Sequence, residues 1–329
     1  YETTTPPRVF KLIDTASKGL TVDTSSVKSV KLTKGATTVT LTDKDYTVSS
    51  DSYSLAESQE GYNAEYAGGK VTTIDLAKYV NKAAGSTSFS NGILEGATVT
   101  VEFEATVNSS AVKAGVGNPN SVELEYSRTP ENVSTKIPGP EVRVYTYEFG
   151  ILKTDMAGNA IQSSKDLKGA QFVIARVNGG SAETFMAKDA TSGAWSDLAA
   201  KPAVDATTGV FTTDANGKIA MSGLPAGEYH VYEIKAPTGY TNIGLPDFKF
   251  TISATFSGTP ESATVSYTKD TGDERISVGA NDGKATVKNA KNLTELPMTG
   301  DLGIKVFITV GVLLMAAGAA FALSARMRA

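Results

Sequence analysis

Residues 145–154 read Tyr-Thr-Tyr-Glu-Phe-Gly-Ile-Leu-Lys-Thr, and their alternation indicates how the second half of the chain folds. In a strand with one buried face, every second residue points into the core. The inward row is then Tyr145, Tyr147, Phe149, Ile151 and Lys153. The sequence therefore predicts a half-buried strand whose apolar row ends in a lysine.

Two more polar residues fall in apolar rows of distant strands: Asn289 follows Ala285 and Val287, and Glu233 follows Tyr229 and Val231. Burying a lone ammonium or carboxylate is costly, so such groups neutralise, pair or react. Desolvation lowers the pKa of a lysine and raises that of a glutamate. A neutral amine is a nucleophile and a protonated carboxyl activates an amide. The three residue types thus suit a Lys–Asn isopeptide bond that each chain forms once.

Each of these residues also has an ordinary role outside a reactive site. A lysine at a strand end often extends its ammonium to solvent. An asparagine near a strand end often begins a turn, and a glutamate in a strand is often solvated. Alternation alone leaves both interpretations open.

The composition favours β-structure and excludes several classes of site. The 329 residues suggest about two domains, and they are rich in Thr, Ser, Gly and Val. The net charge of −4 comes without a basic, aromatic-rich patch, so no nucleic-acid partner is expected. With no cysteine and one histidine, His230, disulfides, Cys–His nucleophiles and His-rich metal centres are excluded. We expect no metal and no cofactor, and we place His230 on the surface.

The chain is predicted to be mainly β, with two tandem Ig-like β-sandwich domains at residues 1–140 and 141–292. A Pro/Gly-containing spacer is expected at 129–140 and a helix near 74–84. In the first domain, residues 99–105 and 120–126 alternate as half-buried strands. In the second, strands are expected near residues 145–153, 170–177, 228–234, 247–255, 263–268 and 284–289.

The C-terminal segment combines a short motif, an apolar run and an arginine tail. Residues 293–300 contain Leu-Pro-Met-Thr-Gly. The following stretch, 301–325, is predicted to be a transmembrane helix, because its uncharged part is long enough to cross a bilayer of about 30 Å. Arg326 and Arg328 in the tail, 326–329, favour a cytoplasmic end. A plain single-span anchor behind a chance pentapeptide is the alternative.

This order of motif, helix and tail resembles the cell-wall sorting signal of Gram-positive surface proteins. The resemblance implies recognition of Leu296, Pro297, Thr299 and Gly300 by the transpeptidase sortase. It implies cleavage between Thr299 and Gly300, after which the threonine carbonyl joins an amine of peptidoglycan or of another subunit. The mature protein would be anchored in the cell wall without the helix.

The second block resembles the collagen-adhesin B-type domain of Gram-positive pilins. The matching stretches are residues 150–155, 167–172, 229–240 and 287–289. The resemblance implies Lys153 as nucleophile, Asn289 as electrophile and Glu233 as catalytic acid of an isopeptide bond between the first and last strands.

The first block resembles the middle domain of backbone pilins, on residues 12–15, 18–20, 45–48 and 117–126. In that family an aspartate takes the acid role, and Asp14 and Asn120 fit the acid and acceptor positions. The partner lysine belongs to an upstream strand, so we expect it to be missing from an N-terminally truncated chain. Lys11 points away from Leu12 and Asp14. The alternative is that Asp14 and Asn120 are turn residues.

Together these features predict a structural subunit of a covalently polymerised surface pilus that supports adhesion. The expected partners are sortase, neighbouring pilin subunits and peptidoglycan, with the host receptor unidentified. The alternative is a wall-anchored adhesin or minor pilin whose ligand-binding domain precedes this chain. An enzyme is not expected beyond the single-turnover isopeptide reaction, because His230 alone does not make a Ser/His/Asp set.

Overall fold

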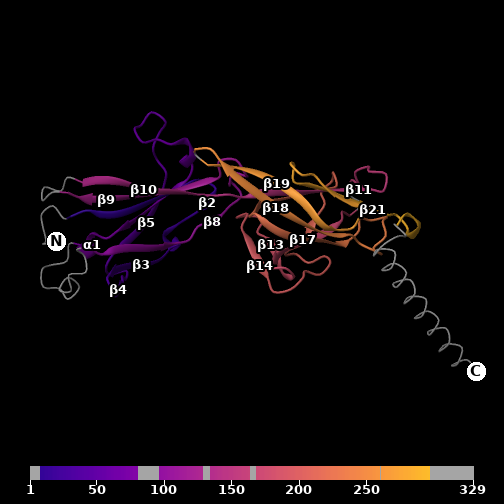
Figure 1. Ribbon diagram of the computed structural model, residues 1–329, viewed down its shortest axis with the longest axis horizontal. Helices are drawn as coiled ribbons and strands as arrows, with labels where there is room; N and C mark the ends of the chain where they lie inside the picture. The colour runs from indigo at the N-terminus through magenta and orange to yellow at the C-terminus, as the bar shows by residue number, and fades with distance from the viewer. Residues whose placement is uncertain (1–7, 81–95, 129–133, 164–167, 260, 297–329) are drawn as a thin grey trace, which may run out of the picture. The chain divides into compact units, whose positions relative to one another are not determined.

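The computed structural model describes residues 8–80, 96–128, 134–163, 168–259 and 261–296. These residues form two compact units built almost wholly of β-strands, which confirms the mainly β prediction (Figure 1). Unit 1 comprises residues 1–146 with the short segments 190–194 and 256–263, and unit 2 comprises the rest. Within the described residues we find no helix with the length and apolarity that a membrane crossing needs. The predicted span at 301–325 lies outside the described part of the chain.

Unit 1 is an antiparallel sandwich. Its larger sheet has the order β10-β9-β1-β6-β5, with bounds Ser134–Val144, Asn118–Ser127, Phe10–Ala16, Lys70–Asp75 and Thr47–Ser52. The second sheet has the order β4-β3-β7, with bounds Thr37–Thr40, Val27–Lys34 and Thr98–Phe103. A small pair joins β2 (Leu20–Thr21) to β8 (Thr106–Val107). Short helical turns lie at η1 (Thr24–Ser26), η2 (Ala64–Tyr66) and α1 (Ala77–Val80).

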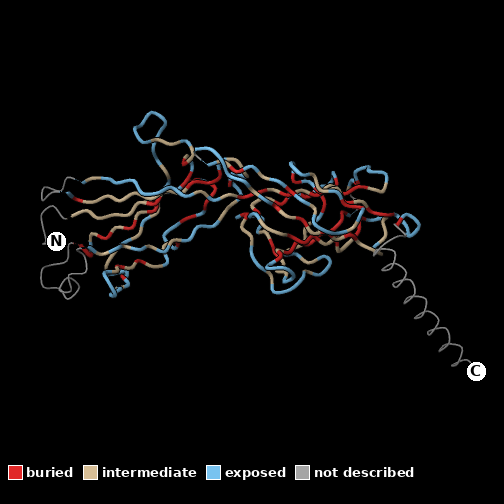
Figure 2. Tube along the Cα trace, in the orientation of Figure 1, coloured by how far each residue is buried: buried red, intermediate tan, exposed pale blue. Residues whose placement is uncertain are grey.

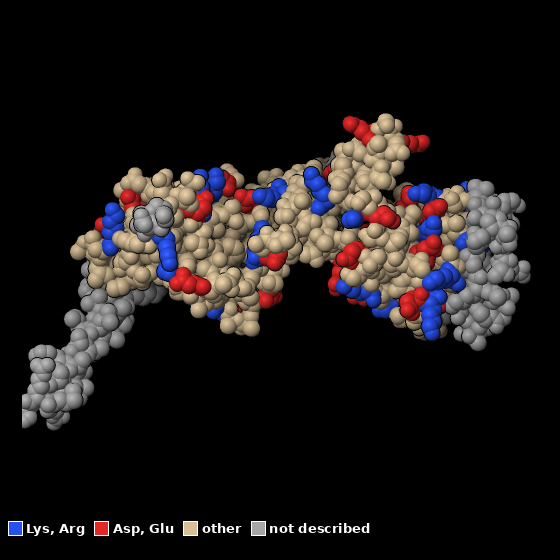
Figure 3. Space-filling view, turned by 180° about the vertical axis from the view of Figure 1, so that it is seen from behind, with Lys and Arg blue, Asp and Glu red and all other residues tan. Residues whose placement is uncertain are grey.

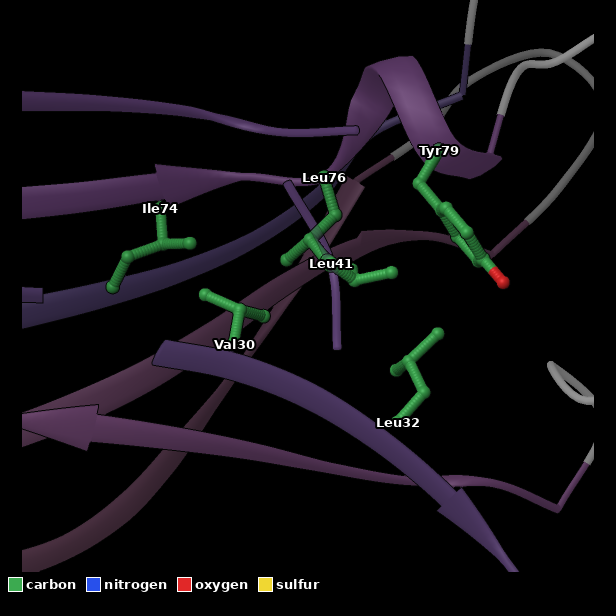
Figure 4. Close-up of a cluster of buried hydrophobic side chains, with 6 residues drawn as sticks. All are labelled: Val30, Leu32, Leu41, Ile74, Leu76 and Tyr79. Atoms are coloured by element: carbon green, nitrogen blue, oxygen red, sulfur yellow. The ribbon is translucent and has the colours of Figure 1, made fainter. Parts of the chain in front are cut away.

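The core of unit 1 lies between its two main sheets. Figure 4 shows Val30 and Leu32 of β3 facing Ile74 of β6, with three further side chains closing the cluster: Leu41, Leu76 and Tyr79. All six are buried, and burying an aliphatic side chain of this size contributes about 1.5–3 kcal/mol. Alternation along β7 follows the prediction, because Val99 and Val101 pack on this core and Phe103 on a second cluster with Leu20 and Val22, while their neighbours face solvent.

The predicted spacer at 129–140 is wrong for its described part, because residues 134–144 form β10 and pair with β9. The prolines that suggested a break lie at an irregularity of the strand, where the pairing register shifts between Pro138 and Glu141. Gly139 allows the close approach, since a Cβ there would lie 2.8 Å from the carbonyl oxygen of Val122. The predicted domain boundary at 140/141 therefore falls inside a strand.

The helix predicted near residues 74–84 is shorter in the described region than expected. Residues up to Asp75 belong to β6, and α1 covers only Ala77–Val80. The Asp75 side chain accepts a hydrogen bond from the Ala77 N–H at 2.8 Å, which supports the start of this turn. Residues 81–84 lie outside the described part of the chain.

Unit 2 also consists of two facing sheets. The smaller has the order β16-β11-β21-β20, with bounds Lys218–Leu224, Tyr147–Asp155, Lys284–Asn289 and Ile276–Val278. The larger has the order β14-β13-β12-β17-β18-β19, with bounds Trp195–Leu198, Ala182–Lys188, Gln171–Asn178, Gly227–Lys235, Asp247–Ser257 and Ser262–Gly272. A short strand, β15 (Phe211–Thr212), also pairs with β12, and the turn η3 (Leu293–Glu295) follows β21. All six strands predicted in this block are confirmed.

The core of unit 2 is aromatic, and Figure 2 shows its buried residues in red along the strands. Phe149 of β11 stacks on Phe250 of β18, with ring centroids 3.7 Å apart. Tyr229 of β17 is fully buried and donates its hydroxyl to the Pro225 carbonyl at 2.7 Å. The inward row of β11 starts at Tyr147 rather than at Tyr145, which precedes the strand and is half-buried. On the outside, Lys and Arg lie among Asp and Glu over the face in Figure 3.

Candidate functional site

Three polar side chains from distant parts of the sequence meet in the core of unit 2. Strands β11 and β21 lie side by side and run parallel, with Lys153 opposite Val287 and Asp155 opposite Asn289 (Figure 1). Lys153 and Asn289 therefore project from adjacent strands of one sheet, while Glu233 comes from β17 in the facing sheet. Lys153 is 0% exposed, Asn289 2% and Glu233 5%.

The three side chains form a closed triangle of hydrogen bonds. The Lys153 Nζ donates to Glu233 Oε2 at 2.7 Å and to Asn289 Oδ1 at 2.5 Å. The Asn289 Nδ2 donates to the second carboxyl oxygen, Glu233 Oε1, at 2.7 Å. One carboxyl oxygen of Glu233 thus accepts from the Lys153 Nζ and the other from the Asn289 Nδ2. A proton can therefore move from the lysine to the asparagine nitrogen through the carboxyl group.

Burial shifts the pKa values of both ionisable groups of this triangle toward their neutral forms. Burial lowers the pKa of the Lys153 ammonium to about 8, although the negative charge of Glu233 acts to raise it. Burial raises the pKa of the Glu233 carboxyl, although the positive charge of Lys153 acts to lower it. The Phe172 ring lies 5.7 Å from the Lys153 Nζ and excludes water on that side. The arrangement thus provides a buried amine, an amide carbon and a carboxyl that can carry protons.

The predicted pair in unit 1 is also together. The Asn120 Nδ2 donates to Asp14 Oδ1 at 2.7 Å, and Asp14 is buried at 6% exposure. Burial raises the pKa of Asp14 to about 6, although the hydrogen bond from Asn120 opposes the shift. The other two oxygens, Asp14 Oδ2 and Asn120 Oδ1, accept no hydrogen bond from any described residue. Asp14 lies within strand β1 and Asn120 within strand β9, so neither is a turn residue.

A cavity of about 300 Å³ adjoins this pair. Besides Asp14 and Asn120 it is lined by Leu12, Ile74, Val101, Phe103, Val122, Pro140 and Val142. Lys11 lies on the strand position next to Leu12 and does not line it. The site therefore offers two acceptors at an apolar cavity to which no described lysine contributes.

The described chain ends within the predicted sorting motif. Leu296 is buried and packs with Ala290, Met156 and Ile243. Its N–H donates to the Leu293 carbonyl at 3.3 Å. Pro297, Thr299 and Gly300 lie outside the described residues, as does the arginine tail.

The surface position expected for His230 is wrong, because the side chain is covered. His230 does lie on the face of β17 opposite the inward row, but it is only 9% exposed. Its Nδ1 lies 2.6 Å from Glu183 Oε1 and its Nε2 2.9 Å from Asp247 Oδ2. The ring also stacks on Tyr232 at 3.9 Å. Side chains of β13 and β18 therefore enclose it, which alternation along one strand does not reveal.

A second buried charge pair, which strand alternation does not predict, lies near the triangle. Arg275 and Asp273 lie in the turn between β19 and β20, and their side chains are 3% and 5% exposed. The guanidinium contacts both carboxyl oxygens of Asp273, at 2.9 and 2.7 Å. Strand alternation does not extend into a turn, so the sequence carried no signal for this pair.

Comparison with known proteins identifies relatives of this chain. Residues 148–269 match the family described as SpaA, a prealbumin-like fold domain. The trypsin-resistant surface T6 protein of Streptococcus pyogenes serotype M6 is 28% identical over 213 residues, which cover 60% of this chain and 34% of that protein. The chain thus spans about a third of the length of this curated relative.

Solved structures of pilins are also similar. The C-terminal fragment of the major pilin GBS80 of Streptococcus agalactiae has a TM-score of 0.47 at 20% identity, covering 85% of this chain and 87% of the fragment. The T6 backbone pilin of serotype M6 Streptococcus pyogenes has a TM-score of 0.44 at 16% identity, covering 87% of this chain and 62% of that chain. By these comparisons, residues 148–269 are similar to a SpaA prealbumin-like fold domain, and the chain is similar in sequence to part of the streptococcal surface T6 protein.

Proposed function

We propose that this chain is a structural subunit of a covalently polymerised surface pilus of a Gram-positive bacterium, and that unit 2 is locked by an isopeptide bond between Lys153 and Asn289. The relationship to the T6 protein supports the pilus role. The observation that carries the bond is the closed, buried triangle of Lys153, Glu233 and Asn289.

The chemistry needs no outside reactant. Lys153 passes a proton to Glu233 across 2.7 Å and becomes a neutral amine. The Nζ forms a bond to the Asn289 side-chain carbon, the bond from that carbon to Nδ2 breaks, and ammonia leaves. Of the two protons that Lys153 gives up, one departs with the ammonia and one stays on Glu233. The fold holds the reacting groups in contact, which supplies much of the rate.

Such a bond would connect the first and last strands of unit 2. It closes a loop of 136 residues and joins β11 to β21, which already lie side by side. The nearest guide to its thermodynamic effect is a native disulfide, which contributes about 2–5 kcal/mol in a small secreted domain. An amide resists reduction, and a pulling force would pass through it rather than through the hydrogen bonds of the sheet.

Attachment and polymerisation complete the proposal. Sortase cleaves between Thr299 and Gly300 and transfers the Thr299 carbonyl to an amine of a neighbouring subunit or of peptidoglycan, and the membrane helix at 301–325 is removed. In unit 1, Asp14 and Asn120 supply the acid and the acceptor of a second isopeptide site, to which no described lysine contributes. The two unfilled acceptors beside an apolar cavity support that role.

The internal bond is tested by the intact mass of the full chain. The wild type should be lighter than its sequence by one ammonia, and Glu233→Ala should have the full mass. Glu228→Ala is the matched control, because Glu228 lies on the same strand but pairs with Lys249 at the surface. If the Glu233→Ala chain still lacks the mass of one ammonia, Glu233 is not needed for the reaction.

The pilus role is tested on cells. Cell-wall extracts should show a ladder of high-molecular-weight species that disappears when sortase is deleted. A single wall-linked species would instead support the alternative of a wall-anchored adhesin or minor pilin.

A further inference from the structure

The buried pair of Arg275 and Asp273 connects the surroundings of two of the three residues in the triangle. The Arg275 Nη2 donates to the Gly244 carbonyl at 2.6 Å, in the loop before β18. The Arg275 carbonyl accepts from the Lys288 N–H at 3.2 Å, one residue before Asn289. One residue therefore holds both that loop and strand β21.

The same loop holds the strand that carries the acid. The Glu233 N–H donates to the Pro246 carbonyl at 3.1 Å, two residues after Gly244. The Asp273 N–H donates to the Asp247 carbonyl at 3.2 Å, so both members of the charge pair bind this segment. A chain of contacts thus runs from Asn289 through Arg275 and the loop to Glu233.

A stabilising role alone is a weak explanation for this pair. Removing an arginine and an aspartate from water carries a desolvation cost that often equals or exceeds their attraction, and apolar residues of similar size would serve a core as well. Arg275 also acts on the triangle through its charge. Besides burial and the contact with Glu233, its positive charge lowers the pKa of Lys153, while the negative charge of Asp273 raises it, so both members of the pair act on the triangle.

We propose that Arg275, oriented by Asp273, is a positioning residue for the bond between Lys153 and Asn289. Its main-chain carbonyl binds Lys288 of β21, and its guanidinium reaches the Gly244 carbonyl. The side chain therefore links β21 to the segment that binds β17, at the separation at which Asn289 and Glu233 meet. This inference rests on the proposed isopeptide bond.

The experiment is a time course of bond formation in the full 329-residue chain. Chains are isolated unfolded from inclusion bodies, refolded by dilution, and sampled by intact-mass spectrometry for the loss of ammonia. Near-UV circular dichroism shows when each variant has reached its native signal. The variants are Arg275→Met, Arg275→Lys and the control Arg176→Met, which removes an arginine paired with Asp197 on the surface.

We expect Arg275→Met to reach the native signal yet lose ammonia roughly 10- to 100-fold more slowly, the effect of a small misplacement of reacting groups. Arg275→Lys should restore part of the rate, since a lysine retains the charge and a donor for Gly244. Arg176→Met should react like the wild type.

A folded Arg275→Met chain that reacts at the wild-type rate overturns the inference while the proposed bond stands. A wild type that never loses ammonia overturns the proposed bond itself, and the inference with it. If Arg275→Met does not fold, Asp273→Asn replaces it. A native Asp273→Asn chain with a slowed reaction supports the role, and one with an unchanged rate refutes it.

Discussion

Substituting Asn289 by alanine removes the electrophile of the proposed bond while leaving Lys153 and Glu233 in contact at 2.7 Å. The main consequence is that 136 residues are no longer closed into a loop in the unfolded chain. The chain-entropy relation for a cross-link assigns about 5 kcal/mol to a loop of that length at 25 °C. We therefore expect unit 2 to lose roughly that amount of unfolding free energy.

The expected loss is large enough for a thermal melt. For a domain of this size each kcal/mol moves the midpoint by roughly 2–4 °C, so Asn289→Ala should lower it by roughly 10–20 °C. The single tryptophan, Trp195, lies in unit 2, where its indole N–H donates to the Ser222 carbonyl at 2.9 Å. Its fluorescence therefore follows the unfolding of unit 2 without a contribution from unit 1.

The control is Asn178→Ala, which removes an exposed asparagine that bonds Thr184 on the outer side of the sheet. It should change the midpoint by no more than a few degrees, since a surface hydrogen bond contributes about 1 kcal/mol. The reasoning is refuted if wild-type chains have lost ammonia but their Trp195 midpoint is no higher than that of Asn289→Ala.

Three further predictions concern single residues of the two units. Asp14 should make unit 1 less stable as the pH rises. Its pKa is raised from 3.8 to about 6 in the folded state, so between these values the folded state binds more protons than the unfolded state, and about 3 kcal/mol is lost by pH 7. To measure this, the protein is equilibrated in urea at each pH, and the exposed amides of β1 are then pulse-labelled at one fixed pH. The unfolding free energy of unit 1 should fall as the equilibration pH rises, and Asp14→Asn should flatten this dependence. Tyr229→Phe should cost unit 2 about 1 kcal/mol in a Trp195-detected urea titration, because the hydrogen bond from the buried tyrosine hydroxyl to the Pro225 carbonyl is lost; no loss would mean that the bond is unimportant. Gly139→Ala should cost unit 1 roughly 1–3 kcal/mol, because its Cβ would lie 2.8 Å from the Val122 carbonyl oxygen, and an unchanged midpoint in calorimetry would contradict the close approach.

The inward direction of three polar side chains could be predicted from the sequence, because the information that it needs is local. Whether Lys153, Glu233 and Asn289 point inward depends on the two-residue period of each strand, and all three are buried. The same period predicted the six strands of the second block. It did not predict β13 and β16: in β13 the buried Met186 and Ala187 are adjacent, and in β16 two partly buried residues separate Met221 from Leu224.

The prediction was wrong where a residue's surroundings come from other strands. His230 was placed at the surface from the period of β17 alone, but Glu183 of β13 and Asp247 of β18 cover it. Residues 134–140 were assigned to a spacer because of their prolines, but pairing with β9 makes them part of a sheet. The buried pair of Arg275 and Asp273 lies in a turn, where no periodic signal exists.

By itself the sequence determined the β class, the strands and the inward direction of three reactive side chains, because alternation is a property of each strand alone. Only the tertiary structure decided that these side chains meet. The parallel pairing of β11 with β21 brings residues 136 positions apart into contact, and the facing sheet supplies the carboxyl. Such contacts depend on strand order and register, which are set by the packing of the whole unit and leave no trace in the pattern of any single strand.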